Sequence, residues 1–128
     1  MHRRRSGFTL AELVIVVVII GILATIAFPM YGGLQARARS SAIRTDLRNL
    51  MTAQELHWGE KGVYTTDVTQ LRFSVSEGVV VTIVEANGGE GWSAKTTHPL
   101  SFPLTCAIFI GNAAVLAPAV NEGAMNCQ

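Results

Sequence analysis

Side chains with catalytic or metal-binding chemistry are few in this sequence and widely spaced. His57 and His98 lack metal-ligand spacing with each other and with the two cysteines, Cys106 and Cys127. A Gly-x-Gly-x-x-Ala motif at 89–94 fits a dinucleotide fingerprint, but the residues after it alternate as a strand and not as a helix. Neither a nucleophile elbow nor a Gly-Lys-Ser/Thr phosphate loop occurs. The sequence therefore predicts no catalytic group, no metal and no cofactor, and we expect a protein that is not an enzyme.

One ionisable residue is unusual because of its surroundings. Glu12 lies in an apolar run from Phe8 to Phe28 that only Thr9, Gly21 and Thr25 otherwise interrupt. An ionised carboxylate in hydrocarbon costs about 3 kcal/mol or more on insertion scales, so Glu12 is expected to have a partner. The alternative is that it lies near the membrane interface and is hydrated.

The apolar run has the length of a membrane span. A helix of its 21 residues is roughly 31 Å long, which matches the hydrocarbon core of a bilayer. Many of its residues are β-branched, but an isolated strand in lipid leaves its backbone groups unpaired, so we expect a helix. Arg3, Arg4 and Arg5 precede it and predict a cytoplasmic N-terminus and an outward C-terminus.

Composition narrows the function further. The 128 residues are 49% apolar and 15% charged, which excludes a disordered chain and makes one domain the default. The formal charge is +1, yet beyond the three N-terminal arginines seven basic residues face nine acidic ones. The bulk charge therefore does not support a nucleic-acid surface.

Three interpretations of the N-terminal segment compete. A secretory signal peptide needs a small-residue cleavage site after the apolar run, and Ala36-Arg37-Ala38 lies too far beyond it, with an arginine in the middle. A plain membrane anchor explains the length and the arginines but leaves Glu12 incidental. The third is a leader cut before the apolar run, so that the hydrophobic helix is kept.

The string Arg5-Ser6-Gly7-Phe8-Thr9-Leu10-Ala11-Glu12-Leu13 resembles the class III leader of type IV pilins and pseudopilins. The resemblance implies cleavage after Gly7 by a prepilin peptidase and N-methylation of the new N-terminal Phe8. It also implies a filament in which the α-ammonium of Phe8 pairs with Glu12 of a neighbouring subunit, although pairing within one chain is also possible. The stretch from Gly21 to Pro29 would be able to unwind in such a filament.

Helical periodicity resumes after Pro29, which bends the helix. An apolar stripe predicts one helix from about Thr9 to about Trp58, with an amphipathic second half and stop signals at Gly59 and Gly62. The stripe comprises Leu34, Ala38, Ala42, Ile43, Leu47, Leu50, Met51 and Gln54. Arg37, Arg44 and Arg48 lie on another face. Such arginines can bind DNA or anionic lipid, but no aromatic residues are interleaved with them, so we expect them to be solvated or to pair with acidic residues of neighbouring subunits.

Residues 59–128 indicate strands and turns. We expect strands at 72–76, 79–86, 92–97 (half-exposed), 104–110 and 113–117, the last two paired through a tight turn at Gly111-Asn112. The predicted fold is α+β: a long N-terminal helix, membrane-spanning in its first half and amphipathic in its second, packed on an antiparallel sheet of about four strands. Its expected divisions are a leader at 1–7, a helix at 8–58 with a filament-core part at 8–28, and a globular part at 59–128.

Cys106 and Cys127 can pair if the globular part faces an oxidising compartment, and otherwise remain free thiols. The resemblance to pilins implies that they form a C-terminal disulfide. It also implies a homopolymeric filament, with a prepilin peptidase and an assembly machinery driven by an external ATPase as partners; nucleic-acid binding stays open.

We therefore expect a structural pilin of a type IV pilus, first in the cytoplasmic (inner) membrane and then in an extracellular filament. The nearer alternative is a pseudopilin of a type II secretion system, in a periplasmic pseudopilus. The resemblance disfavours it, because major pseudopilins carry an acidic calcium loop and lack a C-terminal disulfide. The farther alternative is a monomeric membrane-anchored binding domain.

Overall fold

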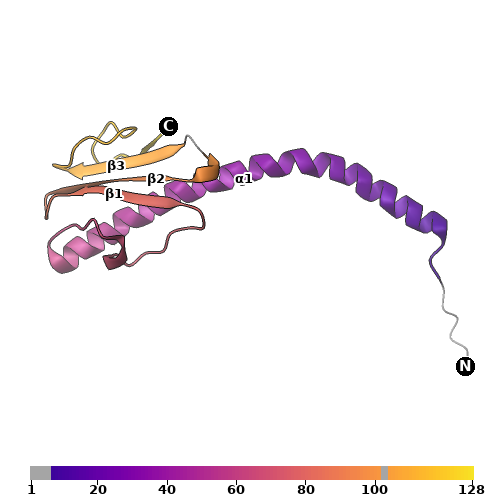
Figure 1. The fold of residues 1–128 in the computed structure, drawn as a ribbon, viewed down its shortest axis with the longest axis horizontal. Coiled ribbons are helices and arrows are strands. Elements are labelled where there is room, and N and C mark those ends of the chain that lie inside the picture. Colours follow the sequence, from indigo (N-terminus) through magenta and orange to yellow (C-terminus); the bar gives the residue numbers. More distant parts are fainter. Residues whose placement is uncertain (1–6, 102–103) are drawn as a thin grey trace, which may run out of the picture. The chain divides into compact units, whose positions relative to one another are not determined.

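A computed structural model describes residues 7–101 and 104–128 (Figure 1). The elements are α1 (Leu10–Lys61), η1 (Val68–Gln70), β1 (Val80–Ala86), β2 (Gly91–Thr97), η2 (Pro99–Ser101), β3 (Thr105–Gly111) and β4 (Asn126–Cys127). They form two compact units, one ending at Gln35 and the other beginning at Ala36, and α1 contributes to both. The expected α+β class is confirmed.

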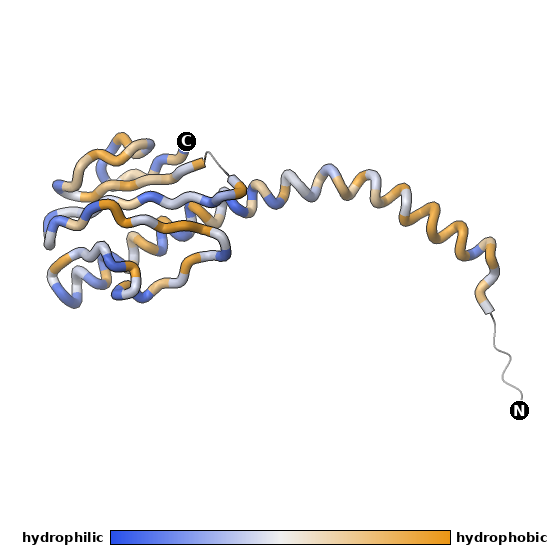
Figure 2. The backbone as a smooth tube through the Cα atoms, in the orientation of Figure 1, coloured by the Kyte–Doolittle hydropathy of each residue, from blue (hydrophilic) through white to orange (hydrophobic). Residues whose placement is uncertain are grey.

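The first unit is an apolar stretch of α1 without a covering layer. Its large side chains are exposed, from Phe8 at 81% to Phe28 at 83%, and Figure 2 shows hydrophobic residues over almost its whole length. The helix continues through Pro29 without a break. By length and composition this stretch is able to cross a membrane.

The C-terminal end of α1 lies beyond the expected Trp58. Gly59 is still helical, and the helix stops after Lys61, where Gly62 adopts a φ of +74°. The N–H of Gly62 donates to the carbonyl of Trp58 at 2.7 Å, which satisfies one of the last free carbonyls of the helix. Gly62 therefore acts as the stop signal and Gly59 does not.

The second unit contains a four-stranded antiparallel sheet in the order β1-β2-β3-β4. One face of the sheet packs on the second half of α1. The shared core consists of Ile43, Leu47, Leu50 and Ala53 from the helix and Trp92, Ala94 and Ile108 from β2 and β3. Fully burying one such large apolar side chain contributes roughly 1.5–3 kcal/mol, so this seam dominates the stability of the unit.

The opposite face of the sheet is also covered. Ala107 and Phe109 of β3 pack against Ala113 and Ala119 of the segment that follows β3. Ser93 pairs in register with Phe109 and is therefore on the same face, where it is 1% exposed. The expectation that 92–97 is half-exposed is wrong, because the segment after β3 forms a second layer.

Two expected strands are absent from the described residues. The segment 72–76 is irregular because Asp46 of α1 accepts hydrogen bonds from the backbone N–H and the hydroxyl of Ser76, at 2.7 and 2.9 Å. The segment 113–117 does not pair with β3 either. Instead β4 pairs with β3, with Cys106 opposite Cys127.

The buried stripe of α1 is shorter than expected and starts later. Leu34 and Ala38 are exposed, whereas Asp46 is 2% exposed and belongs to the buried side. The stripe matches expectation from Ile43 to Gln54, the part that contacts the sheet and the irregular segment.

Candidate functional site

Thr9 and Glu12 form a reciprocal cap at the start of α1. The Glu12 carboxylate accepts from the Thr9 backbone N–H at 2.9 Å and from its hydroxyl at 2.8 Å, and the Glu12 N–H donates to the Thr9 hydroxyl at 3.3 Å. This arrangement is a capping box, which satisfies backbone donors that a helix start leaves free. In the chain that retains residues 1–7, Glu12 therefore has a local partner. The Thr-x-x-Glu spacing was the sequence signal for this cap.

Gly7 and Gly21 do not owe their small size to packing inside the chain. A Cβ added at either position would meet nothing within 4 Å, and neither residue has a positive φ. Any requirement for glycine at these positions therefore comes from something outside this chain. Gly21 and Pro29 both lie in the continuous part of α1, and the Thr25 hydroxyl donates to the Ile22 carbonyl at 2.7 Å.

The start of the chain matches a known sequence family. Residues 2–28 match the model of the prokaryotic N-terminal methylation motif. Over 75 residues, 59% of this chain, the sequence is 45% identical to the type IV major pilin protein PilA of Myxococcus xanthus. In its N-terminal segment the chain is therefore similar to type IV pilins.

Two further relatives are fimbrial proteins. The chain is 42% identical to the fimbrial protein EcpB of Eikenella corrodens over 52% of its length, and 47% identical to the type IV major fimbrial protein FimA of Dichelobacter nodosus over 43%. The matches span 34%, 42% and 35% of PilA, EcpB and FimA. The chain therefore spans between a third and a half of the length of the curated relatives that it matches.

The expected disulfide between Cys106 and Cys127 is confirmed. It links β3 to β4, and beside it Thr105 and Gln128 exchange two backbone hydrogen bonds of 2.9 and 3.0 Å. The bridge therefore fixes a strand of only two residues. In the chain-entropy model, closing a loop of this size contributes roughly 3 kcal/mol.

Three buried polar side chains join the second half of α1 to the rest of its unit. Asp46 binds Ser76, and the Gln54 side-chain amide both donates to the Thr65 carbonyl at 2.7 Å and accepts from the Thr65 N–H at 3.2 Å. The Thr96 hydroxyl donates to the carbonyl of Ile43 at 3.1 Å. These bonds give each of the three side chains a partner and fix the register of the helix against the sheet.

Within the described residues, neither His57 nor His98 belongs to a cluster of potential metal ligands. Across residues 7–101 and 104–128, three or more His, Cys, Asp or Glu side chains do not come together in a way that could hold an ion. His98 is instead buried beside Gly78, and its Nδ1 accepts from the N–H of Leu100 at 3.1 Å. His57, near the end of α1, is partly exposed.

Proposed function

We propose that this chain is a pilin, a structural subunit of a type IV pilus, which polymerises through its N-terminal apolar helix into an extracellular filament. The observation that carries the proposal is the uncovered apolar stretch from Phe8 to Phe28, which lies within the segment that matches the methylation motif. In water such a surface demands cover. Lipid covers it in the precursor, and the same helices of other subunits cover it in the filament.

The proposed processing divides the chain at Gly7. A prepilin peptidase cuts after Gly7, removing 1–7, and the new N-terminal Phe8 is methylated. The open space around Gly7 is compatible with this assignment, because packing within the chain does not require a glycine there. The mature chain then begins with the long helix, which ends at Lys61, and continues from Gly62 with the part that carries the sheet.

Glu12 changes partner in this scheme. Before cleavage Thr9 satisfies its carboxylate. Cleavage creates an α-ammonium on Phe8, and this cation pairs with Glu12 of an adjacent subunit as the helices leave lipid. A paired carboxylate is far cheaper in an apolar interior than an isolated one, so the pair fixes the depth at which each helix enters the filament.

The stretch from Gly21 to Pro29 is the proposed adjustable part of the helix. Pro29 lacks an N–H and Gly21 carries no side chain, so unwinding there sacrifices few contacts. The precursor lies in the cytoplasmic membrane, and extraction into the filament requires an assembly machinery with its own ATPase. The subunit's role is structural and not enzymatic. The disulfide and the pilin relatives support a pilus over a pseudopilus.

The decisive experiment is mass spectrometry of the N-terminal peptide in filaments sheared from cells that make the pilin. We expect a peptide that begins at methylated Phe8. The matched pair is Gly7→Val, expected to retain residues 1–7 and yield no sheared filament, and Gly32→Ala, which also adds a side chain in open space and should be processed normally. Wild-type chain that keeps its leader in cells with an active peptidase would refute the proposal.

A variant of Glu12 tests assembly separately from processing. Glu12→Ala should be inserted and cut at Phe8, since neither step uses the carboxylate, yet give little sheared filament. Glu12→Asp keeps the charge and should recover part of the yield. A wild-type filament yield from Glu12→Ala would remove the ammonium–carboxylate pair from the scheme.

A further inference from the structure

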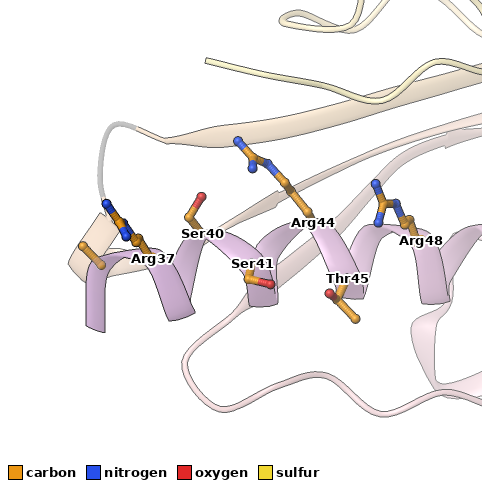
Figure 3. A pocket seen from close by; sticks show the side chains of 7 residues that line it. Arg37, Ser40, Ser41, Arg44, Thr45 and Arg48 are labelled. Carbon is orange, nitrogen blue, oxygen red and sulfur yellow. The ribbon is translucent and has the colours of Figure 1, made fainter. Parts of the chain in front are cut away.

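Three arginines form a row on the exposed side of α1 in the second unit. Arg37, Arg44 and Arg48 are spaced by seven and four residues, which places them on one helix face over about 16 Å. Together with Ser40, Ser41 and Thr45 they line an open hollow, and Figure 3 shows their guanidinium groups projecting from the helix. No carboxylate in the described part of the chain lies within ion-pair distance of this arginine row.

Three glutamates form an acidic rim at one end of the sheet. Glu85 accepts from Asn87 and from the Ala114 N–H, at 2.6 and 3.0 Å. Glu90 accepts from the Asn112 side chain at 2.7 Å, and Glu122 accepts from the Gly111 N–H at 2.8 Å.

All the donors to this rim are neutral. Among the described residues the ion pair that meets the distance criterion joins Arg72 to Glu60, so no cation balances the rim. From Gly62 onward the chain has two basic and five acidic residues, and three of the five are rim glutamates.

The arginine row and the acidic rim belong to opposite ends of the second unit. Thr96, at one end of β2, bonds to Ile43, which lies between Arg37 and Arg44 in the helix sequence. The other end of β2, at Gly91, follows the β1–β2 turn. In this turn the carbonyl of Gly89 accepts a hydrogen bond from the Trp58 indole at 3.2 Å. From Arg48, the last arginine of the row, to Trp58 the helix still rises about 15 Å, so row and rim do not form ion pairs with each other within one chain.

We propose that the arginine row of one subunit docks on the acidic rim of a second copy of this chain. A contact between two different patches is heterologous, and if its rotation does not close a ring it propagates into an open filament. The inference rests on the proposed pilus function and adds to it a polar contact between globular parts. Arginine suits this role because its planar guanidinium can bind a carboxylate through two parallel hydrogen bonds.

The contact sets register more than strength. Exposed ion pairs are individually weak and are screened by salt. Their orientation is nevertheless specific, because like charges facing one another are penalised. The row therefore selects which end of a neighbour it meets, while the apolar helices supply most of the cohesion.

The test is a charge exchange in cells that assemble filaments. Arg44→Glu with Arg48→Glu reverses the row, and Glu90→Arg with Glu122→Arg reverses the rim. We expect each reversal alone to lower the sheared filament yield at least tenfold, and all four substitutions together to restore most of it. Arg72→Glu is the control, because it makes the same type of charge reversal at one position outside the row and should leave the yield unchanged.

A second measurement leaves the charges in place. Arg44→Lys supplies an amine, and a carbodiimide activates a carboxylate so that the amine displaces the urea by-product and forms an amide bond. Filaments treated in this way should yield a peptide that joins Lys at position 44 to Glu90 or Glu122. A mixed filament of isotope-labelled and unlabelled subunits should show that the bond joins two chains.

The outcomes separate the row from the pilus itself. If the row-reversed chain is cut at Phe8 and assembles like wild type, or if the fourfold exchange does not restore assembly, the docking proposal is overturned while the pilus function stands. Row-reversed filaments could also form normally but lose their retention on heparin or duplex DNA. This result would show that the arginine row binds a polyanion, and it would overturn the docking proposal. Absence of wild-type filaments would instead refute the proposed function.

Discussion

Asp46 illustrates how a single buried residue decides the path of a whole segment. Its side chain is 2% exposed and accepts both hydrogen bonds that Ser76 offers. A buried carboxylate is tolerated only when its acceptor sites are used, so the segment around Ser76 is held against α1. A residue that looks like part of a polar helix face thus fixes the long connection between helix and sheet.

Asp46→Ala should destabilise the second unit by about 1–3 kcal/mol, because the backbone N–H and hydroxyl of Ser76 lose their acceptor. The measurement is urea denaturation of the full chain in detergent, followed by tryptophan fluorescence. Thr45→Ala is the control, since Thr45 is exposed next to Asp46 and its replacement should change the unfolding free energy by less than about 0.5 kcal/mol. Equal effects at the two positions would contradict the assigned role of Asp46.

Glu85 of the acidic rim makes the stability of the fold depend on pH. The N–H of Ala114, and then the side chain of Asn87, hold the pKa of Glu85 below its ordinary value of 4.5. A lowered pKa means that the folded state favours the ionised form, so the stabilisation is present above the ordinary pKa and is lost as the pH falls through the folded value. Glu85→Gln should therefore flatten the decline of the denaturation midpoint between about pH 5 and about pH 3. An unchanged acid decline in this variant would show that other groups, such as Asp67, account for it.

At the scale of elements, glycines differ sharply in what they contribute. Gly78 has a φ of +78°, and a Cβ there would lie 2.5 Å from Nε2 of the buried His98. Gly59 is helical, has no positive φ, and a Cβ there would meet nothing within 4 Å. The turn before β1 thus requires glycine, whereas the last turns of α1 do not.

Gly78→Ala should lower the unfolding free energy by more than about 1 kcal/mol, because it combines backbone strain with a clash against His98. Gly59→Ala should raise it by roughly 0.5–1 kcal/mol, because alanine restricts the unfolded chain and suits a helix. Thermal unfolding of the two variants beside wild type measures both. Shifts of the same sign would disprove the distinction.

The elements that sequence patterns predicted are those with strong local signals. The β-branched run at 79–86 and the alternation at 92–97 placed β1 and β2 within a residue of their observed bounds. The segment 72–76 was misassigned because the deciding bond comes from Asp46, thirty residues away. The partner of β3 was missed because β4 has two residues and no propensity signal, and a covalent bond holds it.

The candidate site was predictable to a similar degree. The arginine row could be recognised from spacing alone, and the capping box at Thr9 from its Thr-x-x-Glu pattern. The acidic rim could not, because Glu85, Glu90 and Glu122 come together only through the turns that join the strands. Local periodicity carries no information about such assembly.

The two units of the molecule differ in how much of their apolar surface is buried within the chain. The described residues of the first unit contribute none of the side chains in the two buried clusters, which all come from the second unit. The first unit therefore leaves its apolar surface uncovered within the chain, while the second has a core of its own. Folding of the globular part and association of the apolar helix are thus two separate problems.

A fragment of residues 36–128, produced in an oxidising compartment, should fold as a soluble monomer. The fragment keeps its core, its disulfide and the buried hydrogen bonds of Asp46, Gln54 and Thr96. It lacks the exposed apolar helix of the first unit. Size-exclusion chromatography and thermal unfolding should give one monomeric peak and one cooperative transition. Aggregation, or melting without cooperativity, would show that the first unit supports the fold of the second.

The bond between Cys106 and Cys127 also has a mechanical meaning. Between the two cysteines lies the segment that covers the outer face of the sheet. A pull applied to that segment reaches β3 through covalent bonds at both of its ends, and not through the few hydrogen bonds of a two-residue strand. The outer layer can loosen under load without being drawn out of the subunit, because its contour length between the anchors is fixed.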